Sequence, residues 1–154
     1  MINLQFEEYV NLLKRTIKVD KNKILFVCIG TTNVVWDSIG PFVGNYLKTT
    51  IGTKYVLGDI NNNICSKYDL IKHYSKIKNK YIVAIDSALT NKNLEGEIFV
   101  DNKPIILGLG INKNKGIVGD SSIKICSSKI SDINYIIKVS QFIGKGICEL
   151  KDKY

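Results

Sequence analysis

Arginine, histidine and proline are scarce in this sequence, and the scarcity of arginine bears on the choice of partner. The 154 residues include one arginine, Arg15, and two prolines, and the net charge of +8 comes from lysines scattered along the chain. Bidentate recognition of phosphate or guanine favours arginine, and a nucleic-acid interface concentrates its charge on one face. We therefore expect no specific nucleic-acid partner.

A long apolar run and closely spaced cysteines are also missing. No segment reaches the roughly 18–20 apolar residues that a membrane span needs. Glu7 and Glu8 stand where a secretory signal peptide would be apolar. The four cysteines form no CxxC pair, so neither a zinc ribbon nor a thioredoxin-like redox motif is indicated. We expect a cytoplasmic protein with no membrane association, no metal site and no tightly bound cofactor.

The composition that is present is typical of one globular domain. Hydrophobic residues make up 45% of the chain and charged residues 23%, as in ordinary folded proteins. A chain of this length can bury one sizeable core. We expect a single domain over residues 1–154.

Apolar residues recur at helical spacing in some segments and form short continuous runs in others. The spacing predicts helices over residues 6–17, 38–49, 68–78 and 133–147, and strands over 24–29, 55–58, 81–85, 97–100, 104–107 and 117–126. The runs at 24–29 and 81–85 are apolar throughout, which is typical of strands buried on both faces of a parallel sheet. The alternation of strands and helices predicts an α/β protein with a three-layer α/β/α fold and a mainly parallel sheet.

Two aspartates follow these buried runs. Asp37 comes after the first run and its loop, and Asp86 directly ends the second. In open α/β sheets, sites form beyond the carboxyl ends of the strands, above all where the strand order reverses. If the two strands are neighbours, the carboxylates converge on one crevice, where one retains a proton while the other remains a base. Such a pair can deprotonate a water for attack on a peptide carbonyl and protonate the leaving nitrogen.

Structural roles explain the same residues. Asp37 or Ser38 suits the N-cap of the helix that follows, and Asp86 could hydrogen-bond a turn. Cys28 lies in an apolar run, so we expect a packed thiol with a raised pKa and not a nucleophile. His73, the only histidine, stands in a lysine-rich helical stretch, where a surface position explains it better than a metal site.

A glycine-rich loop precedes the last predicted strand. We expect substrate contacts from Gly108, Gly110, Asn112 and Lys113, because glycines permit close backbone approach and the two polar side chains can reach a carbonyl or an acidic group. A solvated turn explains these residues equally well. The segment lacks both the last glycine of GxGxxG and the GK[ST] of a P-loop, so nucleotide binding is not indicated.

Three segments, in this order, resemble the spore germination proteases and their shorter sporulation relatives, the YyaC-like proteins. The segments are Gly30 to Asp37 with the following Ser-Ile-Gly-Pro, Ala-Ile-Asp86-Ser-Ala-Leu, and Leu107-Gly-Leu-Gly-Ile-Asn-Lys. The likeness extends over roughly residues 22–145. It implies a phosphorylase/hydrolase-like fold, shared with hydrogenase-maturation peptidases, and an acid pair for peptide cleavage. On this resemblance Asp37 and Asp86 take the catalytic roles.

The resemblance implies a sporulation-associated peptidase, with small acid-soluble spore proteins as candidate substrates and the forespore as a candidate location. Zymogen processing is not carried over, because the chain lacks the length of a full germination protease. The hydrogenase-maturation relatives bind nickel with acidic residues and a histidine, and His73 matches no such motif. The alternative is a catalytically silent, regulatory member of the same fold that binds a peptide or protein. The sequence leaves the oligomeric state open, including a homo-oligomer.

Overall fold

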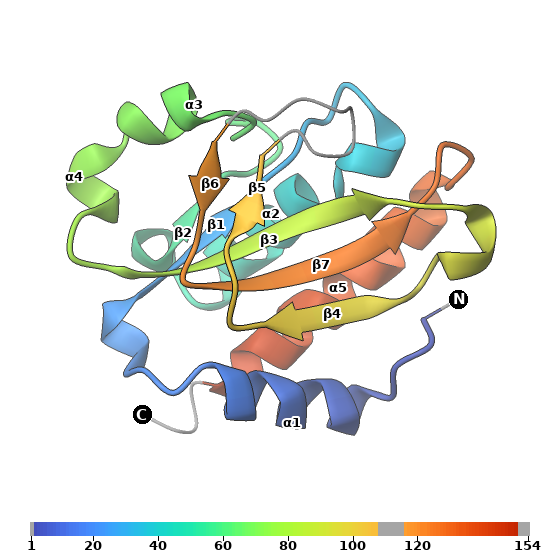
Figure 1. The fold of residues 1–154 in the computed structure, drawn as a ribbon, viewed down its shortest axis with the longest axis horizontal. Helices are drawn as coiled ribbons and strands as arrows, with labels where there is room; N and C mark the ends of the chain where they lie inside the picture. Colours follow the sequence, from blue (N-terminus) through green and yellow to red (C-terminus); the bar gives the residue numbers. More distant parts are fainter. Residues whose placement is uncertain (1, 108–115, 151–154) are drawn as a thin grey trace.

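Five strands form one mainly parallel sheet within residues 2–107 and 116–150, the part of the chain that the computed structural model describes (Figure 1). The strands are β1 (Ile24–Cys28), β2 (Val56–Leu57), β3 (Tyr81–Leu89), β4 (Ile98–Asp101) and β7 (Ser121–Ser127). Their order is β2-β1-β3-β7-β4, and only β4 runs antiparallel to its neighbour. The short strands β5 (Ile105–Ile106) and β6 (Ile117–Val118) form a separate antiparallel pair.

The connections reverse direction at the centre of the sheet. From β1 the chain passes to β2 on one side, and then returns to β3 on the other side of β1. The strand β1 is buried along its whole length and pairs with β3 from Ile24 to Cys28. The topological switch point, where α/β proteins place their sites, therefore lies between the carboxyl ends of β1 and β3.

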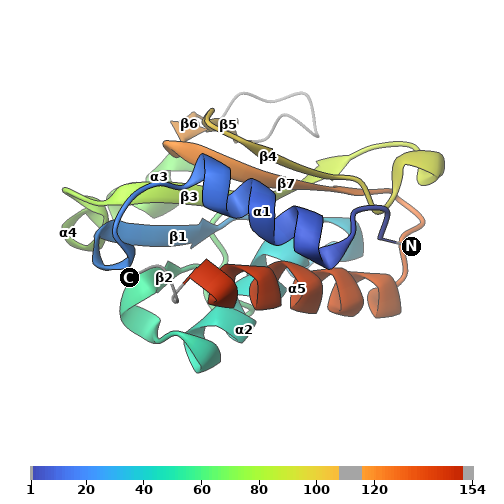
Figure 2. The ribbon, with the colours of Figure 1, turned by 90° about the horizontal axis from the view of Figure 1, so that it is seen from below.

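Helices cover the two faces of the sheet unequally. On one face α1 (Phe6–Thr16), α2 (Ile39–Thr50) and α5 (Ile133–Cys148) pack over the larger hydrophobic core (Figure 2). The other face carries the short helices α3 (Lys67–Ile71) and α4 (Tyr74–Ile77) and the β5–β6 pair, over a smaller core. The three-layer α/β/α fold with a mainly parallel sheet is confirmed. No helix in the described part of the chain has both the length and the apolar character that a membrane crossing requires.

The docking of α1 on α5 shows how the larger core is held together. Tyr9 of α1 is fully buried, stacks on Phe142 with ring centroids 5.3 Å apart, and donates a hydrogen bond of 2.9 Å to the carbonyl oxygen of Ile143. A Cβ at Gly146 would lie 2.2 Å from the Tyr9 ring, so this position has no room for a side chain. At its other end, α5 is capped by Asp132, whose carboxylate accepts from the N–H of Tyr135 over 2.9 Å.

Three segments differ from the sequence predictions, and the other elements agree within about two residues at each end. The helix predicted over 68–78 is two short helices, α3 and α4, interrupted around His73. The strand predicted over 117–126 is divided at Gly119, whose φ of 107° favours glycine, and its halves join different sheets. The strand predicted over 81–85 continues to Leu89 because it pairs with β7, so Asp86 lies inside β3 and not at its end.

Candidate functional site

The two predicted acids lie at the switch point. From β1 the chain passes Gly30 and enters a 3₁₀ turn, η2 (Val35–Asp37), which packs against β3. Asp86 follows Ile85, the residue of β3 that pairs with Cys28 at the end of β1. The charge of Asp37 acts on the carboxyl of Asp86, so the structure brings the two residues into electrostatic contact.

Two glycines allow the chain around Asp37 to lie directly against the end of β1. Gly30 has a φ of 140°, and a Cβ there would lie 2.2 Å from the carbonyl oxygen of Asp37. At Gly40 a Cβ would lie 1.9 Å from the carbonyl oxygen of Ile29. The N–H of Thr31 donates to the same Asp37 carbonyl over 3.0 Å. These contacts hold the backbone at Asp37 in place.

The η2 turn is also joined to β7. The hydroxyl of Ser127, the last residue of β7, donates to the carbonyl oxygen of Trp36 over 2.6 Å. Ser38 is the N-cap residue of α2, and its hydroxyl donates to the carbonyl oxygen of Val35 over 2.7 Å. Of the two N-cap residues that the sequence allowed, the structure therefore selects Ser38, and Asp37 belongs to the η2 turn.

The surroundings of Asp86 oppose ionisation of its carboxyl. Burial, and after it the negative charge of Asp37, raise the pKa of Asp86 well above the ordinary value. The backbone N–H of Ser87, which donates to Oδ1 over 2.8 Å, and the positive charge of Lys124 act in the other direction but do not cancel the rise. Asp86 thus keeps its proton to higher pH than an exposed aspartate, which is what the acid of a carboxyl pair requires.

Lys124 is a charged residue beside the acid pair that the sequence analysis did not select. It is the register partner of Asp86 in the parallel pairing of β7 with β3, so the two side chains share one face of the sheet. It is the one partly exposed residue in a strand that is otherwise buried. The sequence carried a signal for this residue, since Lys124 is a single charge between Ile123 and Ile125. A charged group in an apolar strand needs solvent or a counter-charge, so its position pointed to a nearby acid or an open site.

The four candidate substrate-binding residues, Gly108, Gly110, Asn112 and Lys113, lie outside the described residues. Their neighbours on either side are described. Leu107 is fully buried in the smaller core together with Ala84, which is two residues before Asp86 on the same face of β3. The N–H of Leu107 donates to the carbonyl oxygen of Gly116 over 2.7 Å. The segments that flank the loop therefore lie over the sheet face that carries Asp86.

Cys28 is not available as a nucleophile. It is fully buried, and burial raises the pKa of Cys28 to about 12, so the group stays a neutral thiol as the sequence predicted. His73 precedes α4. Within residues 2–107 and 116–150, no group of three or more His, Cys, Asp or Glu side chains could hold a metal ion.

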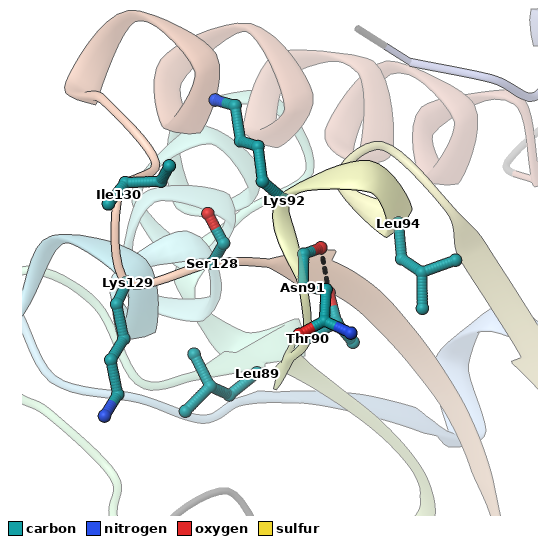
Figure 3. A pocket seen from close by; sticks show the side chains of 8 residues that line it. All are labelled: Leu89, Thr90, Asn91, Lys92, Leu94, Ser128, Lys129 and Ile130. Carbon is teal, nitrogen blue, oxygen red and sulfur yellow. Dashed lines mark hydrogen bonds between the residues drawn. The ribbon is translucent and has the colours of Figure 1, made fainter.

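A pocket of about 600 Å³ opens beyond the carboxyl ends of β3 and β7 (Figure 3). One wall is the segment that follows β3, and the other is the turn that follows β7. Leu89, the last residue of β3, lines the pocket and lies three positions after Asp86 in the same strand. At roughly 3.3 Å per residue, Leu89 is about 10 Å from Asp86 along β3.

Fold and site define an α/β protein with two interacting aspartates at the switch point of a mainly parallel sheet. A family model described as "Protein of unknown function (DUF1256)" matches residues 3–145, and the chain belongs to this family. The chain is also similar to the "Uncharacterized protein YyaC" of Bacillus subtilis (strain 168), with 32% identity over 124 residues. The match covers 78% of this chain and 56% of that relative, so the chain spans little more than half of the relative's length. The YyaC-like resemblance is confirmed.

Proposed function

We propose that this protein is a peptidase in which Asp37 and Asp86 hydrolyse a peptide bond. The observation that carries the proposal is that Asp37, in a turn packed against β3, lies close enough to Asp86 for its charge to add to the effect of burial, and together they raise the pKa of Asp86 well above the ordinary value. Two carboxyl groups with one proton between them can perform acid–base hydrolysis without a metal ion or a covalent intermediate. The resemblance of the segments around both aspartates to the germination proteases supports the same reaction.

In this mechanism Asp37 is the base and Asp86 is the acid. Asp37 accepts a proton from a water molecule as the water oxygen bonds to the peptide carbonyl carbon. The C–N bond then breaks as Asp86 transfers its proton to the leaving nitrogen. Asp37 is left protonated and Asp86 ionised, and proton exchange with solvent restores the starting pair. The positive charge of Lys124 favours the ionised form of Asp86 that this transfer creates.

Small acid-soluble spore proteins are the substrates that we propose to test first, and the cytoplasm of the forespore is the proposed location. Both proposals come from the resemblance to the germination proteases. The similarity to YyaC agrees with the smaller, sporulation-associated group within that resemblance.

The test is cleavage of a mixture of small acid-soluble spore proteins, followed by mass spectrometry of the products. Wild type should yield discrete fragments, and Asp37→Asn and Asp86→Asn should yield none while keeping a native circular dichroism spectrum. Asp20→Asn is the matched control, because Asp20 is an exposed aspartate whose side chain is 74% accessible. Cleavage by either variant at the wild-type rate would exclude the acid pair.

A peptide-binding protein that does not cleave is the second candidate. The pocket beyond β3 and β7 favours it, since an open pocket lined by Lys92 and Lys129 can bind a peptide without any acid pair. Binding of spore proteins that survives in Asp37→Asn and Asp86→Asn, with no fragments from wild type, would support this candidate over the peptidase.

A further inference from the structure

We infer that the outer side of α3 and α4 binds an anionic lipid surface, with Tyr68, Ile71 and Tyr74 at the level of the headgroups and the lysines around them paired with lipid phosphates. These three residues are called the α3–α4 patch below. The inference uses none of the residues of the acid pair and does not depend on peptidase activity. The sequence-based expectation of no membrane association rested on the missing apolar run, which adsorption to a lipid surface does not require.

The α3–α4 patch consists of large side chains that face solvent. Tyr68, Ile71 and Tyr74 are 67%, 62% and 67% exposed. They follow one another at intervals of three residues, so neighbouring members of the patch lie on adjoining parts of the helical surface. The inner side of the same stretch is already occupied, since Leu70 is buried in the smaller core and Ile77 packs against that core. A surface helix normally presents polar residues to water, and a cluster of exposed apolar residues marks an interaction surface.

The stretch that carries the patch is strongly basic. Residues 67–80 contain five lysines and one acid, Asp69. The carboxylate of Asp69 accepts from the backbone N–H groups of Cys65 and Ser66 over 2.9 and 3.0 Å, so it is engaged at the start of α3. None of the four exposed lysines of the stretch forms a salt bridge with a residue that the structure describes. These lysines are Lys67, Lys72, Lys78 and Lys80.

Two turns outside the stretch extend this basic surface. The ammonium group of Lys80 donates to the carbonyl oxygen of Asn22 over 3.2 Å, which places the 3₁₀ turn η1 (Lys21–Lys23) beside the end of the stretch. Lys76 of α4 donates over 2.9 Å to the carbonyl oxygen of Thr53, in the 3₁₀ turn η3 (Thr53–Tyr55). The two turns bring further ammonium groups to this side of the molecule, those of Lys21 and Lys54, at 5.2 and 4.9 Å from the centroid of the Tyr55 ring.

A lipid surface fits this combination better than a second copy of the chain or a nucleic acid. A second copy would bring the same lysines against one another, and like charges oppose that contact. A nucleic acid would use the tyrosine rings for base stacking, but the ammonium group of Lys72 lies 4.6 Å from the centroid of the Tyr68 ring and covers one side of it. Ile71 has no ring to stack on a base. At an anionic membrane, phosphates attract the lysines, and tyrosine and aliphatic side chains settle at the headgroup level.

Co-sedimentation of the full chain with vesicles at low salt tests the inference. One set of vesicles is phosphatidylcholine alone, and the other contains equal parts of phosphatidylcholine and phosphatidylglycerol. The protein should bind the anionic vesicles at least about tenfold more tightly, because each lysine near an anionic surface contributes about fivefold. Equal binding to the two compositions, or binding to neither, would overturn the inference.

Removal of apolar groups from the patch separates it from net charge. The double variant Ile71→Ser, Tyr74→Ser keeps every lysine and changes two exposed positions, and it should bind the anionic vesicles about fivefold or more weakly than wild type. Phe99→Ser is the matched control, because Phe99 is 50% exposed on β4, at the opposite edge of the sheet from β2, and it should bind as wild type does. Unchanged binding by the double variant would overturn the inference, since only the net charge of the chain would then be responsible.

Two lysine pairs test the position of the charge. Lys72→Gln with Lys78→Gln should weaken binding to the anionic vesicles by about tenfold or more. Lys138→Gln with Lys145→Gln removes the same charge from exposed positions on α5, which covers the other face of the sheet, and should weaken binding little. An equal loss in both pairs would overturn the assigned surface. Circular dichroism of each variant checks that the fold is kept.

Three further readouts examine the location and the other partners. Bicelles that contain phosphatidylglycerol should shift the backbone amides of residues 68–78 in ¹H–¹⁵N spectra, and shifts confined to α5 would overturn the inference. A dimer of wild type that Ile71→Ser, Tyr74→Ser abolishes would overturn it in favour of a second copy. A fluorescein-labelled single-stranded oligonucleotide of about 20 nucleotides would do so in favour of nucleic acid, if the same variant weakened its binding as much as that of vesicles. None of these measurements involves peptide cleavage, so their outcome and that of the peptidase test are independent.

Discussion

Replacing Gly40 by alanine should destabilise the protein and displace Asp37. A Cβ at this position would lie 1.9 Å from the carbonyl oxygen of Ile29, whereas real Cβ atoms essentially never come within 3.0 Å of another heavy atom. The start of α2 must therefore retreat from the end of β1 by about 1 Å or more. The obstacle is backbone, so no side-chain rotation can relieve the contact.

The size of the effect follows from two opposing contributions. Alanine is more favourable than glycine inside a helix by about 1 kcal/mol. Overpacking costs about 1–3 kcal/mol, and more where the backbone has to move. For Gly40→Ala we expect a net loss of about 2 kcal/mol in the free energy of unfolding. With a urea dependence of about 2 kcal/mol per molar, the unfolding midpoint should fall by about 1 M.

Urea unfolding followed by circular dichroism measures this loss. Thr49→Ala is the control, because Thr49 is exposed on the same helix and its replacement should change stability little. The displacement of Asp37 should also lower the pKa of Asp86, which NMR titration of the carboxyl carbon can follow. If Gly40→Ala proved as stable as wild type, the close contact between α2 and β1, and with it the described position of Asp37, would be refuted.

Three further outcomes are expected. Asp37→Asn should lower the pKa of Asp86 but leave it above the ordinary value, because burial is the larger cause of the rise and remains. An NMR titration in which the pKa of Asp86 does not change would contradict the described pair. The folded-state pKa of Asp86 lies above its unfolded value of about 4, so wild type should lose stability as the pH rises from about 4 through the folded pKa, and Asp86→Asn should remove that loss. Parallel curves of stability against pH for wild type and Asp86→Asn would argue against a raised pKa for Asp86. Burial would raise the pKa of Asp59, but the hydrogen bond from Lys48, 2.6 Å long, and two backbone N–H groups outweigh burial and lower it. Lys48→Met should therefore cost about 2 kcal/mol at neutral pH. This cost should shrink as the pH falls from about 4 through the lowered folded pKa of Asp59, where the carboxylate gains its proton. A pH-independent cost in urea unfolding would exclude this account.

The surroundings of Asp37 could be predicted from neighbouring residues. The apolar run from Ile24 to Cys28 is buried on both faces of the sheet, Gly30 adopts a positive φ where the strand ends, and Pro41 lies in the first turn of α2. Each of these features is local, so the placement of Asp37 between a strand and a helix follows from the order of the residues.

The continuation of β3 beyond Asp86 could not be predicted in this way. Ser87, Ala88 and Leu89 form strand because they pair with residues 125–127 of β7, almost forty positions later in the chain. The same pairing places Lys124 beside Asp86. The register between two distant segments depends on how the whole sheet packs, and the local apolar pattern does not contain it.

The pocket beyond β3 and β7 could not be predicted from the local sequence either. Its lining residues come from one segment after β3 and another after β7, and nothing in either segment alone indicates that the two meet. The sequence by itself determined the buried strands, most of the helices and the place of Asp37 between a strand and a helix, since burial periodicity and glycine conformations are properties of neighbouring residues. Only the tertiary structure decided which side chains meet. The raised pKa of Asp86, the nearby charge of Lys124 and the lysine-lined pocket arise from pairing between distant strands, which brings together groups that the chain order keeps apart.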